Sequence, residues 1–101
     1  QGFANHIIIA AAKGGIEGLT LTLAAELAPH IRVNAIAPAL VETPLGQTVA
    51  KSETMRKSVS ALHPIPRLGT PEEVAELAAF LLDNQKSGWI TGQVIGVDGG
   101  R

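Results

Sequence analysis

The stretch Ile31-Arg-Val-Asn-Ala-Ile36 decides the fold class of this chain. Its apolar residues alternate at Ile31, Val33 and Ala35, which is typical of a β-strand, and Pro38 is expected to stop that strand. A long helical segment precedes the strand, and a second helix and a second strand follow it. This order predicts an α/β domain with parallel strand pairing.

The helix before the strand is expected over Ile9–Ala28, because apolar residues recur there every three or four positions. The positions that carry this spacing are Ile16, Leu19, Leu23 and Leu27. Small and apolar residues also cover the opposite side. The helix is therefore expected to be buried on two faces, one against a sheet and the other against a neighbouring subunit.

The middle of the chain predicts a loop, a short helical segment over Gly46–Leu62 and an extended segment over His63–Gly69, where two prolines disfavour helix. Thr70-Pro-Glu-Glu73 then carries a helix start, with a capping threonine, a proline at the first position and the glutamate of a capping box. This second helix is expected to end near Asn84. A polar turn over Gln85–Gly88 is expected to follow it.

The end of the chain predicts a second strand over Val94–Val97 and a turn at Asp98-Gly-Gly100. Two strands are too few for a parallel sheet to stand alone, so the rest of the sheet is expected from polypeptide outside this sequence. The start at Gln1, without a methionine and close to apolar sequence, also suggests a piece of a longer chain.

Composition excludes several classes of function. Eight Lys and Arg residues against nine Asp and Glu leave a net charge of −1, which argues against binding to nucleic acid or to an anionic membrane. The absence of cysteine excludes disulfides and thiolate metal sites and fits a cytoplasmic protein. The three histidines, His6, His30 and His63, lack metal-ligand spacing, so no metal is expected.

Four short motifs stand in order along the chain. They are Ala12-Lys13 on the first helix, Arg32-Val-Asn-Ala-Ile-Ala-Pro38 with Thr43 five residues on, Pro71-Glu-Glu-Val74, and Ile90-Thr-Gly-Gln93 leading to Val97-Asp-Gly-Gly100. Together they resemble the carboxy-terminal part of the short-chain dehydrogenase/reductase family. The resemblance covers nearly the whole chain.

This resemblance implies a Rossmann-type, doubly wound parallel sheet, with residues 1–101 as the carboxy-terminal portion of a single domain. It also implies bound NAD or NADP and a homodimer or homotetramer, with the first helix at one interface and the second helix and last strand at another. The glycine-rich turn that cradles the pyrophosphate is absent from this sequence. The chain by itself is therefore expected to bind a dinucleotide poorly.

Lys13 stands at the lysine of the family's Tyr-x-x-x-Lys motif. The resemblance implies that its ammonium group hydrogen-bonds the nicotinamide ribose and lowers the pKa of a tyrosine four residues earlier, which transfers the proton. The alternative is a surface lysine paired with Glu17. This sequence departs from the motif, because Ile9 stands at the tyrosine position and the chain contains no tyrosine.

His6 is the candidate for a substitute acid. If the helix begins early, His6, Ile9 and Lys13 share one face, and imidazole titrates in the useful range. Gly2 and Asn5 instead favour a loop or a helix cap, which would make His6 a solvent-facing or structurally bonded histidine.

Pro38, Val41 and Thr43 fall where the resemblance implies contact with the nicotinamide ring. The alternative is a proline that merely ends a strand and a solvated threonine. Residues Leu45–Leu62 correspond to the family's substrate-covering segment, and nothing in them identifies the small-molecule substrate.

Two functions follow as hypotheses. The first is the carboxy-terminal portion of an NAD(P)-dependent oxidoreductase for a hydroxyl or carbonyl substrate, inactive as this chain alone. The second is a non-catalytic relative that serves as an oligomerisation or nucleotide-sensing module, which Ile9 at the tyrosine position favours.

Overall fold

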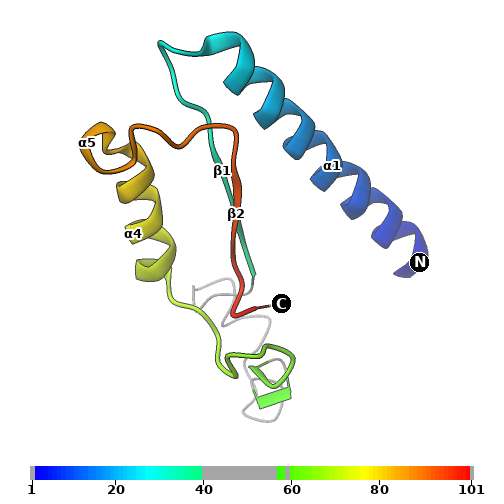
Figure 1. The fold of residues 1–101 in the computed structure, drawn as a ribbon. Coiled ribbons are helices and arrows are strands. Elements are labelled where there is room, and N and C mark those ends of the chain that lie inside the picture. Colours follow the sequence, from blue (N-terminus) through cyan, green and yellow to red (C-terminus); the bar gives the residue numbers. More distant parts are fainter. Residues whose placement is uncertain (1, 40–56, 59, 101) are drawn as a thin grey trace.

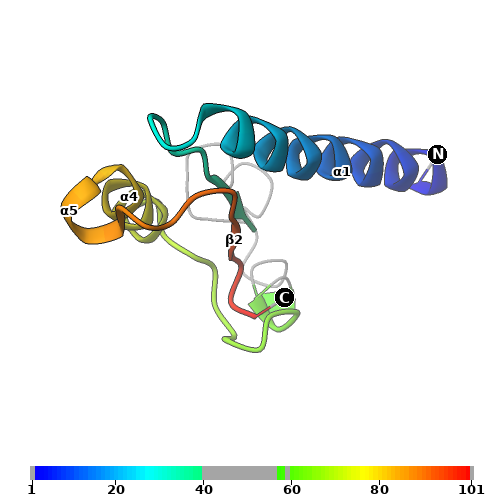
Figure 2. The same ribbon diagram turned by 45° about the horizontal axis from the view of Figure 1, so that its top comes forward.

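The computed structural model describes residues 2–39, 57–58 and 60–100. Its elements in chain order are α1 (Gly2–Leu27), β1 (Ala35–Pro38), α4 (Pro71–Leu82), α5 (Asn84–Ser87) and β2 (Val94–Val97). The two strands lie between α1 and α4 (Figures 1 and 2). They pair in parallel, from Ala35 opposite Val94 to Pro38 opposite Val97, which confirms the α/β class and the parallel pairing.

Helix α1 begins at Gly2, seven residues before the predicted start at Ile9. The prediction was wrong because it gave weight to Gly2 and Asn5 as loop residues. No proline stands between Gly2 and Ile9, and the helix propensities of the other residues there cost less than about 1 kcal/mol each relative to alanine. Gly2 lies in the first turn, where the backbone N–H groups have no intrahelical partner in any helix. A glycine there therefore costs the helix no hydrogen bond.

The face of α1 that packs on the sheet is confined to its last two turns. Thr20 and Ala24 are buried, and Leu23 and Leu27 are half-buried. Towards its amino end the helix diverges from the strands (Figure 1).

Ile16 and Leu19 of the predicted apolar stripe are 55% and 58% exposed in this single chain. Burial of the second face of α1 against a neighbouring subunit stays a prediction. Where α1 does pack, the approach is close: a Cβ added at Gly92 would lie 3.4 Å from the Ala24 Cβ. Gly92 also has a φ of +75°, which other residues rarely adopt.

Strand β1 begins at Ala35, four residues later than predicted. The preceding residues bond to the segment before β2 mainly through side chains, beside one backbone bond from the Gly92 N–H to the Val33 carbonyl at 2.7 Å. The Val33 N–H donates to the Thr91 hydroxyl at 3.0 Å, and the Asn34 side chain donates to the Ile90 carbonyl at 3.0 Å and accepts from the Gln93 N–H at 3.1 Å. The alternation of Ile31, Val33 and Ala35 did not reveal these bonds.

Strand β1 ends at Pro38, as predicted, with the proline as its last residue. The Ala35 N–H donates to the Gln93 carbonyl just before β2 at 2.8 Å, and the Ala39 N–H donates to the Val97 carbonyl at 3.0 Å. Because successive residues of a strand face opposite edges, Pro38 directs its missing N–H to the edge away from β2. The proline therefore costs the observed ladder no hydrogen bond.

Helix α4 begins as the sequence predicts. The Thr70 hydroxyl accepts from the Glu73 N–H, and the Glu73 carboxylate accepts from the Thr70 N–H, which completes the capping box, with Pro71 in the first turn. Leu81 is buried at the end of the helix. The predicted polar turn after it is instead the one-turn helix α5, capped by the Asp83 carboxylate on the Gln85 N–H.

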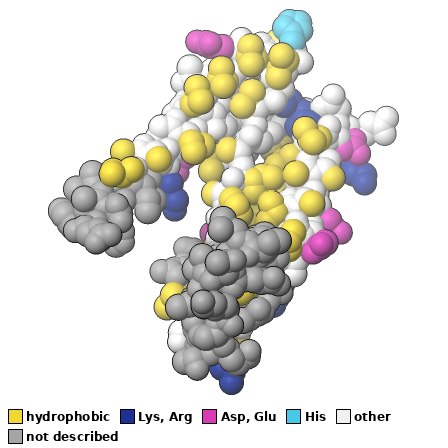
Figure 3. All heavy atoms as spheres, turned by 180° about the vertical axis from the view of Figure 1, so that it is seen from behind, with side chains coloured by type: hydrophobic (Ala, Val, Ile, Leu, Met, Phe, Trp, Pro, Cys, Tyr) yellow, Lys and Arg dark blue, Asp and Glu magenta, His cyan; other side chains and the backbone are white. Residues whose placement is uncertain are grey.

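Little apolar surface is buried in the described part of the chain. The buried apolar residues there are Ala24, Leu68 and Leu81. Hydrophobic side chains line α1 and the space between the helices on the face seen in Figure 3. The large exposed ones include Ile8, Ile16, Leu21, Leu82 and Trp89, the last 99% exposed. No helix among the described residues has the length and apolar character needed to cross a membrane.

Candidate functional site

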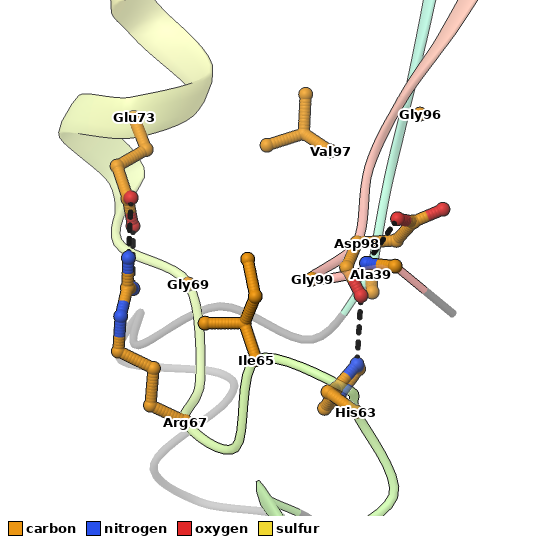
Figure 4. Close-up of a pocket in the computed structure, with 11 residues that line it drawn as sticks. Ala39, His63, Ile65, Arg67, Gly69, Glu73, Gly96, Val97, Asp98 and Gly99 are labelled. Atoms are coloured by element: carbon orange, nitrogen blue, oxygen red, sulfur yellow. Dashed lines mark hydrogen bonds and ion pairs between the residues drawn. The ribbon is translucent and has the colours of Figure 1, made fainter.

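The carboxyl ends of β1 and β2 lie side by side at one end of the strand pair, and a cavity of about 260 Å³ opens there. Val97 lines it from β2, Ala39 from just after β1 and Ile65 from the loop before α4. The Arg67–Glu73 pair forms one wall (Figure 4). In open parallel sheets, ligands bind beyond the carboxyl ends of the strands. The cavity is therefore the candidate site.

Pro38 lies at this edge, at the end of β1, opposite Val97. The Ala39 N–H donates to the Val97 carbonyl at 3.0 Å, so the chain leaves β1 still attached to β2. Val41 and Thr43 lie outside the described residues, as does the predicted helical segment from Gly46 to residue 56.

The turn after β2 forms as predicted. The Gly100 N–H donates to the Asp98 carboxylate at 2.9 Å. The turn is bonded to the loop before α4, because the Ile65 N–H donates to the Gly99 carbonyl at 2.9 Å and the His63 Nδ1 lies 2.8 Å from the Asp98 carbonyl oxygen. Residues His63–Gly69 contain no helix, as expected.

Arg67 and Glu73 form a bidentate ion pair on the cavity wall. The two guanidinium nitrogens lie 2.8 and 2.7 Å from the two carboxylate oxygens. The hydrogen bond from Arg67, followed by that from the Thr70 N–H, lowers the pKa of Glu73 from 4.5 to about 2. Glu73 thus remains ionised at every ordinary pH and serves both the cap and the pair.

The stability that Glu73 provides is expected to disappear in acid. Its folded-state pKa of about 2 lies below the ordinary 4.5, so unfolding takes up a proton between these values. The stabilisation is therefore complete above about pH 4.5 and is lost as the pH falls towards about 2. In a folded polypeptide that contains the rest of the sheet, Glu73→Gln should lower the Tm at pH 6, and its Tm should converge on that of the wild type near pH 2.

Both side chains of the pair are about half exposed, so the difference in Tm should be small and should shrink with added salt. Glu76→Gln, an exposed position on the same helix, is the control and should leave the Tm unchanged. A Glu73→Gln difference that is constant from pH 2 to 6 would contradict this role.

Lys13 and His6 both belong to α1, seven residues or about two turns apart. His6 is therefore on a helix, contrary to the loop favoured by Gly2 and Asn5. Lys13 is exposed, and within the described residues it forms no ion pair with Glu17. Helix α1 runs opposite to β1, so its amino-terminal half points towards the end of the molecule that holds the strand carboxyl ends (Figure 1). Among the hydrogen bonds and ion pairs of the described residues, none joins Lys13 to the carboxyl ends of the strands.

The sequence did not reveal the structural roles of two polar residues, Arg32 and Asn34, which were named only as part of a motif. Arg32 donates to the Asn84 side chain at 2.9 Å and to the carbonyls of Ile90 and Leu81 at 3.0 and 2.7 Å. With Asn34 it ties the start of β1 to α4, α5 and the segment before β2. The available signal was the presence of these two polar residues inside an alternating apolar stretch. In the described ranges, no group of three His, Cys, Asp or Glu residues could hold a metal ion.

The chain matches known proteins along its length. Residues 1–101 match a family whose description is enoyl-(acyl carrier protein) reductase. The 3-oxoacyl-[acyl-carrier-protein] reductase FabG of Thermotoga maritima is 47% identical over 92 residues, which cover 90% of this chain. The L-xylulose reductase of Bos taurus is 38% identical over 101 residues, which cover 99% of it.

A solved structure gives the same likeness in three dimensions. The 3-oxoacyl-[acyl-carrier protein] reductase of Brucella melitensis with bound NAD superposes with a TM-score of 0.75 at 42% identity, over 90% of this chain. The matches cover only 36% of the Thermotoga protein, 41% of the bovine protein and 32% of the Brucella chain. This chain thus spans between about a third and two fifths of the length of these relatives.

Proposed function

Because the chain belongs to the short-chain dehydrogenase/reductase family, we propose that it is the carboxy-terminal part of an NAD- or NADP-dependent oxidoreductase for a hydroxyl or carbonyl substrate. The observation that carries the proposal is the likeness to reductases over the whole of residues 1–101. The polypeptide that would contain this chain is called the complete polypeptide below. It would supply the remaining strands of a doubly wound Rossmann sheet and the glycine-rich turn.

The openness of the fold supports this completion. Each strand pairs with one neighbour within the described residues, and apolar side chains on both sides of the strand pair stay exposed. Additional strands and helices would cover this surface, and burial of apolar area is the main stabilising contribution to folding.

The described residues fit part of a nicotinamide cofactor. The ammonium group of Lys13 is exposed and can donate to the ribose hydroxyls, and Pro38 lies at the carboxyl end of β1, where the nicotinamide ring would contact it together with Val41 and Thr43. When bound, the nicotinamide exchanges a hydride with the substrate carbon. The described residues offer no counterpart for the pyrophosphate, which is left to the complete polypeptide.

The proton in this reaction needs a donor other than the residue at position 9. An isoleucine carries no proton to transfer, and the chain has no tyrosine. His6 lies on α1 and is the substitute within this chain, but it stands one turn farther from Lys13 than the tyrosine position does. Slow proton transfer is the expected consequence.

The second function, a non-catalytic oligomerisation or nucleotide-sensing module, is favoured by Ile9 at the tyrosine position. In either case we propose a homodimer or homotetramer in the cytoplasm. The exposed apolar residues of α1, among them Ile16 and Leu19, would form one interface, and Leu82 and Trp89 would lie at another.

Cofactor binding by the complete polypeptide tests the proposal. Titration calorimetry with NADH and NADPH should give a Kd on the order of micromolar for one of them, a value within the range of ordinary substrate affinities. Lys13→Met should weaken that binding roughly tenfold or more, because a charged hydrogen bond to the ribose is lost. Lys86→Met, an exposed lysine of α5, is the matched control and should have no effect.

Failure of both coenzymes to bind would contradict the oxidoreductase. Binding without turnover of any carbonyl substrate would favour the nucleotide-sensing module instead.

A further inference from the structure

We propose that His63 is a positioning residue for the Pro38 end of β1, where the proposed oxidoreductase would hold its nicotinamide ring. The inference rests on the proposed function for its link to the cofactor. The contacts that carry it are independent of that function.

His63 is buried, with 6% of its surface exposed. Its Nδ1 lies 2.8 Å from the Asp98 carbonyl oxygen, and a carbonyl oxygen can only accept a hydrogen bond. The Nδ1 atom must therefore carry the hydrogen and donate it. The imidazole is fixed in the Nδ1–H tautomer with its donor aimed at the turn after β2 (Figure 4).

The backbone of the turn and its close approach to the loop at His63 both favour glycine. Gly99 has a φ of +63°, and a Cβ added there would lie 3.2 Å from the His63 Cβ. Gly100 has a φ of +93°, and its added Cβ would lie 3.1 Å from the Pro64 Cγ. A second hydrogen bond, from the Ile65 N–H to the Gly99 carbonyl at 2.9 Å, joins the same two segments. We call this set of contacts the His63 clasp.

The clasp is continuous with the end of β1. Asp98, whose carbonyl accepts the His63 hydrogen bond, directly follows Val97, and the Val97 carbonyl accepts the Ala39 N–H at 3.0 Å. Pro38 lies opposite Val97, and the hydrogen bond that holds the chain to β2 beside it is the one from the Ala39 N–H. The position of Pro38 therefore depends on Val97 and Ala39, and the clasp fixes the residue next to Val97.

Two substitutions in the complete polypeptide separate this role from simple packing. In His63→Asn the amide Nδ2 can take the place of the Nδ1 donor, whereas in His63→Leu no donor remains. His63→Leu should raise the cofactor KM about fivefold to tenfold, as the loss of one hydrogen bond implies, with kcat changed less than about twofold. His63→Asn should restore the KM to within about twofold of the wild type.

The control for these substitutions is His30→Leu, an exposed histidine after α1, which should leave both constants unchanged. If His63→Leu does not fold, His63→Gln replaces it, because its longer side chain cannot put a donor at the Nδ1 position. An asparagine variant as impaired as leucine or glutamine, or an unchanged KM in all variants, overturns the proposal.

A readout without turnover keeps the two hypotheses distinguishable. The ring 15N spectrum of the wild type should show a protonated Nδ1 at His63, and the Ile65 amide should exchange faster with solvent in His63→Leu than in His63→Asn. If the wild type has a protonated Nδ1 at His63 and a slowly exchanging Ile65 amide but binds no cofactor, the proposed function and the link to Pro38 are both overturned. Normal cofactor binding with an unprotonated Nδ1 overturns the role of His63 alone.

Discussion

Substituting tyrosine for Ile9 in the complete polypeptide is expected to raise the rate of carbonyl reduction by roughly 100-fold or more, the usual contribution of a positioned proton donor. Helix α1 is continuous from Gly2 to Leu27, so positions 9 and 13 lie one turn apart on the same face. A phenol at position 9 would then stand beside the Lys13 ammonium group, which lowers the pKa of the phenol.

The matched control is Ile9→Phe, because phenylalanine has nearly the same shape as tyrosine but lacks the hydroxyl. It should reduce carbonyl substrates no faster than the wild type. The double variant Ile9→Tyr/Lys13→Met should lose most of the gain. If His6 supplies the proton in the wild type, His6→Ala should slow the wild type but not Ile9→Tyr. Equal rates for Ile9→Tyr and Ile9→Phe would contradict the assignment of position 9.

The elements that could be predicted are those whose signals lie within a few residues of one another. The Thr70–Glu73 capping box spans four residues, and both of its hydrogen bonds are present. Strand β2 and the Asp98 turn likewise depend on short patterns of apolar residues and glycines. Local chemistry decides these features, so the sequence alone was sufficient.

The features that the sequence did not reveal depend on partners far along the chain. Strand β1 begins late because Asn34 bonds to residues 56 and 59 positions away. Arg32 reaches Ile90 across 58 positions, and His63 reaches Asp98 across 35. An alternating pattern cannot show which polar side chain will meet which carbonyl, so both the boundary of β1 and the His63 clasp needed the structure.

The candidate site was predicted in part. Pro38 lies at the carboxyl end of β1, and Lys13 lies on a helix, as expected. The roles of Lys13, His6, Pro38, Val41 and Thr43 stay predictions. The cavity wall formed by Arg67 and Glu73 was not predicted. The capping box accounts for the bonds of Glu73 to Thr70 but gives no sign of its second partner, Arg67, six residues earlier.

The isolated chain of residues 1–101 is expected not to fold cooperatively. A compact protein of 10.5 kDa exposes about 5,400 Å² and has a radius of gyration of about 13 Å, whereas this chain exposes 7404 Å² with a radius of 15.9 Å. A two-stranded sheet with three buried apolar residues in the described part cannot offset the conformational entropy lost on ordering the chain. The missing stabilisation must come from the strands and helices of the complete polypeptide.

Denaturant unfolding of residues 1–101 against the complete polypeptide, followed by circular dichroism at a concentration where light scattering reports a monomer, tests this central claim most directly. The complete polypeptide should unfold in one cooperative transition, and the isolated chain should change gradually, with no protection of the β1 amides from solvent exchange. A monomeric chain of 101 residues that unfolds cooperatively and protects the Ala35 and Ala39 amides would contradict the account.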